Sequence, residues 1–255
     1  MKNKLIIANW KMNSTVTDAL KFLAVFRHEM KGMTPCEVVL CPPFTCLYAL
    51  GEAFEETPFK LGAQNMHWEE SGAFTGEISS LFLKDLNVQY VLLGHSERRT
   101  LFGETDININ KKLEQAIHQK ITPVVCVGET DEEHKEGKTF AVLEHQIKKA
   151  LDGQIRSELA TMVWAYEPVW AIGTGKNATP DQAQEVISWM RTLLAKVLDD
   201  PTASTMRILY GGSVSAEKAR GFLKQSDIDG LLVGGASLDP QKFANIVQSA
   251  QEQNA

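Results

Sequence analysis

The chain has 255 residues, of which 44% are hydrophobic and 23% charged, and its formal net charge is −6 at pH 7. A chain of this size can bury enough apolar surface to fold without disulfides or a structural metal. The acidic balance argues against a general nucleic-acid-binding protein, which carries a basic excess, but leaves room for a local site that binds a small anion.

The N-terminal sequence lacks the pattern of a targeting segment. The apolar run Leu5–Ala8 is shorter than the core of a signal peptide, and Asn9 and Lys11 follow it. No segment approaches the roughly 18 apolar residues of a membrane span. We therefore expect a cytoplasmic protein without a membrane partner.

The four cysteines do not form a metal-binding pattern. Cys36, Cys41 and Cys46 recur every five residues but have neither CxxC spacing nor a histidine partner. We expect no metal site, and we interpret these three residues and Cys126 as small buried hydrophobic groups.

Short apolar runs alternate with helical periods along the chain. The runs are nearly continuous, as in parallel strands that are buried on both faces. We predict strands at Leu5–Ala8, Val38–Leu40, Leu61–Ala63, Val91–Leu93, Val124–Val127, Met162–Ala165, Ile208–Tyr210 and Leu231–Val233. Apolar residues spaced three and four apart predict helices between them, for example over 109–117, 143–151, 183–197 and 243–250.

Two helix starts have a recognisable sequence pattern. Thr179 is an N-cap candidate followed by proline at the first helical position and Gln182 at the third, and Asp239-Pro240 repeats the cap-then-proline pattern. Eight strands that each precede a helix favour a closed (β/α)8 TIM barrel, an α/β fold that we predict as one domain over residues 1–255. An open doubly wound sheet is the alternative.

In such a barrel the functional residues lie on the loops that follow the strands. Glycine pairs occupy two of these junctions, at 211–212 and 234–235. Glycines allow backbone N–H groups to approach an anion closely, so the pairs favour a phosphate site, although tight turns alone would also explain them.

Residues 170–178 resemble two nucleotide-binding motifs but match neither well, because a Walker loop needs a glycine at 170 and Ser or Thr at 177. The G-x-G-x-x-A match that begins at Gly173 lies several residues past its predicted strand. A glycine-rich segment between Pro168 and Ala178 is more typical of a mobile lid.

Three titratable residues follow predicted strands. Lys11, His95 and Glu167 supply a fixed cation, a polarising acid and a base, which is the set that proton transfer next to a carbonyl needs. Each residue alone also fits a structural or solvent-exposed role. Their shared position opposite the predicted phosphate site favours catalysis.

Six motifs at these positions are similar to those of the triosephosphate isomerase family, in the family's order and over nearly the whole chain. They are NWKMN (9–13), GHSERR (94–99), CVGE (126–129), AYEPVWAIGTGK (165–176), YGGSV (210–214) and VGGAS (233–237). The resemblance implies a glycolytic and gluconeogenic isomerase that interconverts dihydroxyacetone phosphate and D-glyceraldehyde 3-phosphate through an enediolate.

The resemblance also implies roles for individual residues. Glu167 matches the general base, His95 the neutral electrophile and Lys11 the cation, which is the established pattern of this same family. The substrate-binding positions are Asn9, Lys11, Gly173, Ser213, Gly234 and Gly235. The supporting positions are Glu97, Ile172 and Leu232. The lid positions are Pro168, Val169, Trp170, Lys176, Asn177 and Ala178, of which Asn177 departs from the family's frequent Thr or Val. No cofactor is expected, because only protons move.

Residues 64–79 form a long predicted loop that carries Met66, Trp68 and Phe74. Long loops in compact domains are usually functional, and apolar tips suggest an interface. In the resembling family this loop docks into a second subunit with the position of Thr75 near the partner's catalytic site, so we expect a homodimer. The alternative is a loop that folds back onto its own barrel.

Two other functions stay open on the residues. A Schiff-base aldolase shares the phosphate-binding barrel but generally needs a buried lysine at a central strand end, where this chain has Glu167. A non-catalytic scaffold would bind triose phosphate without turning it over.

Overall fold

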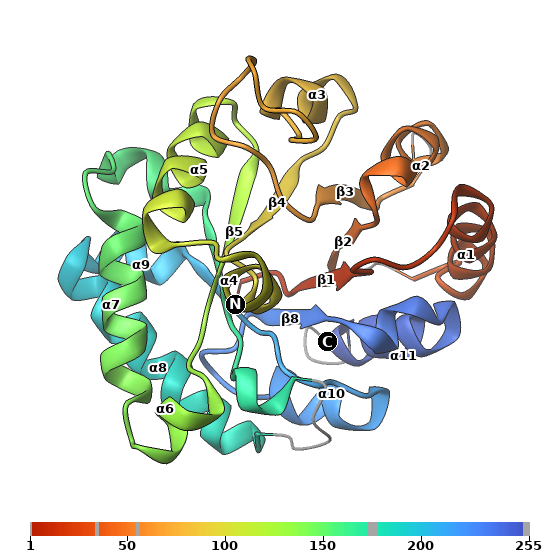
Figure 1. The fold of residues 1–255 in the computed structure, drawn as a ribbon. Coiled ribbons are helices and arrows are strands. Elements are labelled where there is room, and N and C mark those ends of the chain that lie inside the picture. The colour runs from red at the N-terminus through yellow and green to blue at the C-terminus, as the bar shows by residue number, and fades with distance from the viewer. Residues whose placement is uncertain (1, 34–35, 55–56, 173–177, 252–255) are drawn as a thin grey trace.

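The computed structural model describes residues 2–33, 36–54, 57–172 and 178–251. Parallel strands form a closed barrel in chain order, in which β8 pairs with β1, and helices surround it (Figure 1). The strands are β1 (Leu5–Asn9), β2 (Glu37–Cys41), β3 (Lys60–Ala63), β4 (Tyr90–Leu93), β5 (Thr122–Val127), β6 (Val163–Tyr166), β7 (Arg207–Tyr210) and β8 (Gly230–Val233). The closed TIM barrel is thus confirmed and the open sheet excluded.

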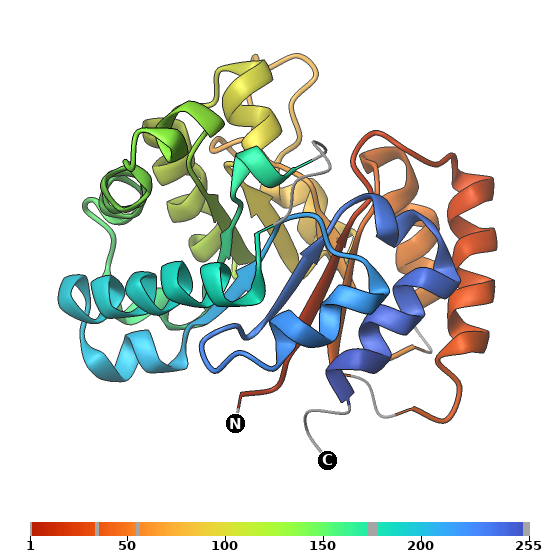
Figure 2. The same cartoon turned by 90° about the horizontal axis from the view of Figure 1, so that it is seen from below.

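Helices connect successive strands and cover the outside of the barrel, as the view from below also shows (Figure 2). The α-helices are α1 (Val16–Glu29), α2 (Leu47–Phe54), α3 (Ser80–Asp85), α4 (Ser96–Phe102), α5 (Asp106–His118), α6 (Asp131–Lys135), α7 (Thr139–Leu151), α8 (Pro180–Val197), α9 (Asp200–Thr205), α10 (Ala216–Leu223) and α11 (Pro240–Gln251). The 3-10 turns are η1 (Phe44–Cys46), η2 (Arg156–Thr161), η3 (Val169–Ala171) and η4 (Gly235–Leu238).

The predicted helix starts are present. Thr179 caps α8 with a capping box to Gln182, and Pro180 is the first residue of that helix. Pro240 likewise begins α11. Among the described residues, no helix is long and apolar enough to cross a membrane.

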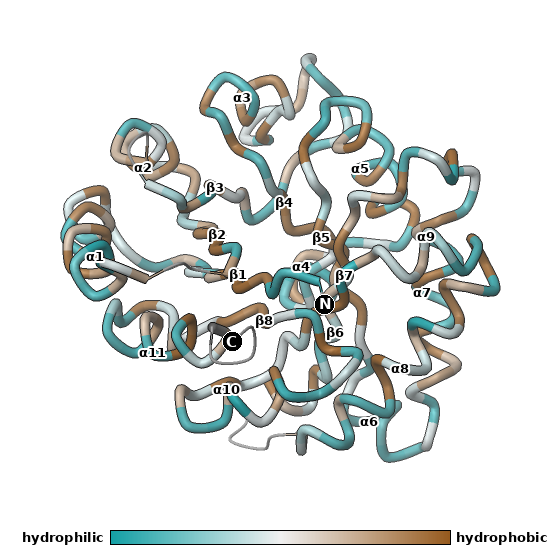
Figure 3. Tube along the Cα trace, turned by 180° about the vertical axis from the view of Figure 1, so that it is seen from behind, coloured by the Kyte–Doolittle hydropathy of each residue, from teal (hydrophilic) through white to brown (hydrophobic). Residues whose placement is uncertain are grey.

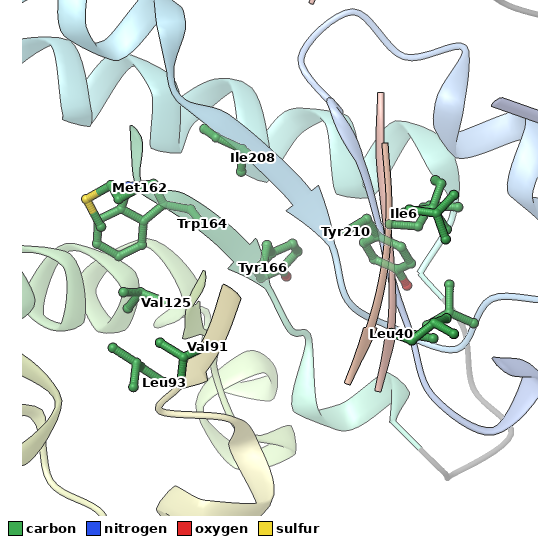
Figure 4. Close-up of a cluster of buried hydrophobic side chains, with 14 of the residues drawn as sticks. Ile6, Leu40, Val91, Leu93, Val125, Met162, Trp164, Tyr166, Ile208 and Tyr210 are labelled. Carbon is green, nitrogen blue, oxygen red and sulfur yellow. The ribbon is translucent and has the colours of Figure 1, made fainter. Parts of the chain in front are cut away.

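Alternate residues of every strand except β3 belong to two separate apolar clusters. Side chains such as Ile7, Leu92 and Ala165 fill the inside of the barrel. Their neighbours, such as Ile6, Leu93 and Trp164, pack outward in the larger cluster with the helices, part of which Figure 4 shows. Burial on both faces explains the continuous apolar runs of the sequence, and brown hydrophobic stretches recur along the strands in Figure 3.

A polar network closes the N-terminal mouth of the barrel, opposite the strand ends where function is expected. The Glu37 carboxylate accepts hydrogen bonds from Lys60 Nζ at 2.6 Å, from the Tyr90 hydroxyl and from the Arg207 guanidinium. Burial raises the pKa of Glu37, but these three donors outweigh burial and lower the pKa to about 2. The ionised form therefore stabilises the fold.

We expect Glu37→Gln to lower the free energy of unfolding at pH 7 by about 2 kcal/mol, because it removes the charged acceptor of a partly buried ion network. The pKa of Glu37 is lower in the folded than in the unfolded chain. Its stabilisation is therefore present above the unfolded value of about 4.3 and is lost as the pH falls toward 2.

Urea unfolding at pH 7 and pH 3 measures this effect, and the difference between Glu37→Gln and wild type should be smaller at pH 3. The exposed Glu52 on α2 offers a control, since Glu52→Gln should behave as wild type at both pH values. An equal difference between Glu37→Gln and wild type at pH 7 and pH 3 would contradict the role of the charge.

Candidate active site

A cavity of ≈ 480 Å³ lies at the C-terminal ends of the strands. Most of the residues predicted to bind or transform substrate line it, although they come from β1, β4, β6, β7 and β8 and the segments after them. The predicted residues in its wall are Asn9, Lys11, His95, Glu167, Ile172, Ser213, Leu232, Gly234 and Gly235.

The remaining predicted residues lie elsewhere. Glu97 contacts Lys11 from outside the wall of the cavity. Pro168, Val169 and Trp170 follow Glu167 in the chain, and Ala178 is buried just before α8. Thr75 is exposed on the loop after β3. Gly173, Lys176 and Asn177 lie outside the described residues.

Glu167 is a buried carboxylate, only 2% exposed, directly after β6. Its Oε2 accepts a hydrogen bond from the backbone N–H of Ser96 at 2.9 Å, and its Oε1 lies 3.0 Å from His95 Nε2. Burial raises the pKa of Glu167, but His95, the Ser96 N–H and Lys11 together outweigh burial and lower it. In this arrangement Glu167 is therefore ionised at neutral pH.

Two glycines make room for Glu167. A Cβ at Gly128 would lie 1.8 Å from the Glu167 carbonyl oxygen, and one at Gly211 would lie 2.9 Å from its Cγ. Side chains at these positions would displace the carboxylate or the backbone that carries it. The glycines that follow β5 and β7 thus fix where Glu167 sits.

His95 is the N-cap of α4, and its Nδ1 accepts a hydrogen bond from the backbone N–H of Glu97 at 3.2 Å. An accepting Nδ1 places the ring proton on Nε2, which points at Glu167. Burial lowers the pKa of His95, but the adjacent Glu167 carboxylate outweighs burial and raises it. The proton affinity of the ring therefore depends on where that carboxylate is.

Lys11 is held in a conformation that few non-glycine residues adopt, with φ of 53°. Asn9 Oδ1 accepts a hydrogen bond from the Lys11 backbone N–H at 3.0 Å, and the Gln64 amide donates to the Lys11 carbonyl at 2.8 Å. The Lys11 Nζ donates to Glu97 Oε1 at 2.6 Å. These contacts hold the ammonium at the edge of the cavity.

The other end of the cavity is built from backbone and small residues. It is lined by residues 211–215 after β7 and by Gly234–Ala236 after β8, with Lys218 at the start of α10. Gly234 immediately precedes the turn η4. Backbone N–H groups at such starts, together with nearby cations, suit an anion.

Sequence reasoning missed several contributors to this site. The Ser96 amide that holds Glu167, the space left by Gly128 and the Gln64 contact to Lys11 all depend on residues far apart in the chain. The GHSE motif could have pointed to the Ser96 N–H. The first N–H groups of a helix have no partner within the helix, so a helix that begins after His95 leaves the Ser96 N–H able to donate to another group. Nothing in the sequence paired Gln64 with Lys11.

The loop of residues 64–79 differs in one respect from its prediction. Met66 is fully buried, so it is not an apolar tip of this loop, and His67 stacks against both Trp68 and Phe74. Phe74 is 42% exposed. Met66, three residues past the end of β3, packs instead into the outer core.

The sequence is similar to those of known proteins over nearly the whole chain. The triosephosphate isomerase family profile matches residues 4–250. The chain is 50% identical to a triosephosphate isomerase of Dictyoglomus turgidum over 98% of this chain and 100% of that protein. Identity to the enzyme of Alkaliphilus metalliredigens is 49%, over 97% of this chain and 99% of the relative. Identity to the enzyme of Carboxydothermus hydrogenoformans is 48%, over 98% of this chain and 100% of that protein. The chain belongs to the triosephosphate isomerase family.

Proposed function

We propose that Glu167, His95 and Lys11 together catalyse the interconversion of dihydroxyacetone phosphate and D-glyceraldehyde 3-phosphate, the reaction of this family. The observation that carries the proposal is the contact of the buried Glu167 carboxylate with His95 Nε2 in the wall of the cavity. A base and a hydrogen-bond donor in contact can act on two adjacent atoms of one small substrate.

Glu167 is the base in this proposal. With dihydroxyacetone phosphate it takes a proton from C1, and the electron pair moves to give an enediolate with negative charge on the C2 oxygen. Transfer of the hydroxyl proton from O1 to O2 then moves the negative charge to O1, and Glu167 returns its proton to C2 as the C1 carbonyl of the aldehyde forms. The carboxylate must exchange the Ser96 N–H for the substrate, after which its burial favours proton uptake.

His95 donates a hydrogen bond from Nε2 to the oxygens on which charge develops. The Glu97 N–H at Nδ1 disfavours a second ring proton, so the ring donates without becoming an imidazolium. Once Glu167 turns toward the substrate, the carboxylate that raises the pKa of His95 moves away. Burial, which lowers that pKa, remains.

Lys11 supplies the fixed positive charge beside the enediolate. Its pairing with Glu97 holds the ammonium at a defined place. A Schiff-base aldolase needs an amine that attacks a carbonyl, and a lysine held as an ion pair does not suit that chemistry. A preorganised donor of this kind is typically worth about 2.7–4 kcal/mol in the transition state.

The phosphate of the substrate would bind to backbone N–H groups near Ser213, Gly234 and Gly235. The segment after Glu167, beginning at Pro168, would act as a lid, with Ile172 and Leu232 as apolar walls beside the base. Exclusion of water matters because an exposed enediolate phosphate eliminates its phosphate group.

We also propose that the protein is a cytoplasmic homodimer. Support comes from large apolar side chains left exposed on one chain, among them Met12 (96%), Leu101 (71%) and Phe102 (69%). Met12 adjoins Lys11, and α4, which carries the other two, begins just after His95. A partner's 64–79 loop with Thr75 at its tip would cover such side chains, which would couple assembly to the site.

Glu167→Gln should lower kcat for glyceraldehyde 3-phosphate by about 10²–10⁴-fold, because the amide cannot accept the proton. A coupled assay with glycerol-3-phosphate dehydrogenase, which oxidises NADH, measures this. Affinity for inorganic phosphate should stay near that of wild type. Glu167→Asp keeps a carboxylate on a side chain one methylene shorter, and its kcat should lie between those of wild type and Glu167→Gln. Wild-type turnover by Glu167→Gln would show that Glu167 is not the base.

Lys11→Met should lower kcat by about 10²–10³-fold and raise KM, since the cation acts on both the phosphorylated substrate and the enediolate. The exposed Lys21 on α1 gives a charge-matched control, and Lys21→Met should leave both constants unchanged. An unchanged kcat/KM for Lys11→Met is incompatible with the electrostatic role.

Specific activity should fall when the protein is diluted, if only the dimer completes the site. Sedimentation velocity over the same concentrations should show the dimer dissociating in parallel. Thr75→Arg places a bulky charge in the proposed interface. Both the loss of specific activity and the dissociation of the dimer should therefore occur at higher protein concentration in this variant. A monomer that retains full activity would rule out the coupling.

A further inference from the structure

Glu129, a residue with a buried carboxylate, attaches the segment that leads away from Glu167 to the barrel. This side chain is fully buried in the turn that follows β5. Its Oε1 accepts hydrogen bonds from Trp170 Nε1 at 2.8 Å and from the Tyr166 hydroxyl at 3.1 Å, and its backbone oxygen accepts one from the Val169 N–H at 3.1 Å. Glu129 therefore holds the chain on both sides of Glu167.

A histidine lies against this attachment. The His134 ring, on α6, stacks on the Trp170 indole with centroids 4.4 Å apart and planes 20° apart. Its Nδ1 lies 3.4 Å from Glu129 Oε1. The α6 helix is anchored by a capping box between Thr130 and Glu133, so its first turn is a firm support for the ring.

A charge on His134 acts on the groups that face its ring. From the turn after β5 comes the Glu129 carboxylate, from η3 the indole of Trp170, and from α7 the Thr139 hydroxyl at 3.5 Å. The charged neighbours along α6 and just after it form ion pairs of their own: Lys135 with Asp131 and Lys138 with Glu136. Within the described residues, Glu129 is the carboxylate within 4.0 Å of the ring.

We infer that His134 is a positioning residue, whose positive form strengthens the hold of Glu129 on Trp170 and so on the segment after Glu167. This inference rests on the proposed function only where it concerns substrate. A protonated imidazole attracts the Glu129 carboxylate and stacks more favourably on an indole, whereas a neutral ring does neither. Histidine is the side chain that changes between these states near neutral pH.

The arrangement held in this way is the one in which Glu167 rests on the Ser96 N–H. Substrate must draw Glu167 away from that donor, and the segment that follows it must adjust. A stronger hold on Trp170 therefore opposes binding of the substrate and of anions that resemble the enediolate. Such ligands should bind more weakly when His134 is charged.

Two variants represent the two states. His134→Arg carries a permanent charge on a planar group that also stacks on tryptophan, and His134→Gln is neutral. The inhibition constant of 2-phosphoglycolate, a phosphorylated carboxylate, should be measured from pH 5.5 to 8 and divided by the wild-type value at the same pH. Ionisation of the ligand, Glu167 and His95 is common to all three proteins and cancels in this ratio.

For His134→Arg we expect a ratio of about 3 at pH 8 that approaches 1 at pH 5.5. For His134→Gln we expect a ratio near 1 at pH 8 that falls to about one third at pH 5.5, in the range that partly exposed ion pairs contribute. The exposed His145 faces Asp106 at 3.7 Å and serves as the control, so His145→Gln should show flat ratios of 1. Ratios for both His134 variants that do not change with pH would overturn the inference.

A second measurement needs neither substrate nor activity. The indole N–H resonance of Trp170, assigned with Trp170→Phe, should move with pH in wild type and lose that movement in His134→Gln. An unchanged titration in His134→Gln would assign it to another group and overturn the inference. If the protein failed to isomerise triose phosphates, the proposed function would fall, while this spectrum would still test the coupling of His134 to Trp170.

Discussion

The cost of burying the Glu167 charge is the constraint on which the rest of the site depends. Removing a carboxylate from water costs several kcal/mol unless hydrogen bonds or opposite charge replace the solvent. Here the Ser96 N–H and His95 Nε2 replace it. Both donors belong to the start of α4, so the position of one helix determines whether the carboxylate is stable in its charged form.

The order of the parallel strands brings that helix close to Glu167. His95 follows β4 and Glu167 follows β6, so β5 lies between them. The Glu167 backbone can lie against the end of β5 because Gly128, which follows that strand, has no Cβ to strike the Glu167 carbonyl group. An open sheet with the same strands would place the same residues at one edge, but the β8 and β1 contributions, including Lys11, would lie far from the others.

The sequence pattern predicted this frame well because each strand is buried on both faces, which leaves a continuous apolar run, and because polar residues follow it at once. The same logic located Lys11, His95 and Glu167. It failed for the Ser96 amide and for Gly128, because the sequence does not show that the Ser96 N–H and the space at Gly128 lie against residue 167 in the folded chain. The role of Met66 was also misjudged, since an apolar residue a few positions past a strand end packs inward as readily as it faces a partner.

The buried carboxylates of Glu167 and Glu129 both accept hydrogen bonds, but Glu167 has to move during the reaction whereas Glu129 has to stay in place. Glu167 must give up its hydrogen-bond donors whenever it moves. These hydrogen bonds therefore have to be strong enough to keep the carboxylate charged and weak enough to be replaced by contacts with the substrate. Glu129 keeps Trp170 and Tyr166 in place and has His134 beside it, partly exposed to solvent. A donor that gains or loses charge with pH adjusts how firmly the chain is held without altering Glu167 itself. The stiffness of the segment and the basicity of the carboxylate are thus set by separate residues, and a change in one need not disturb the other.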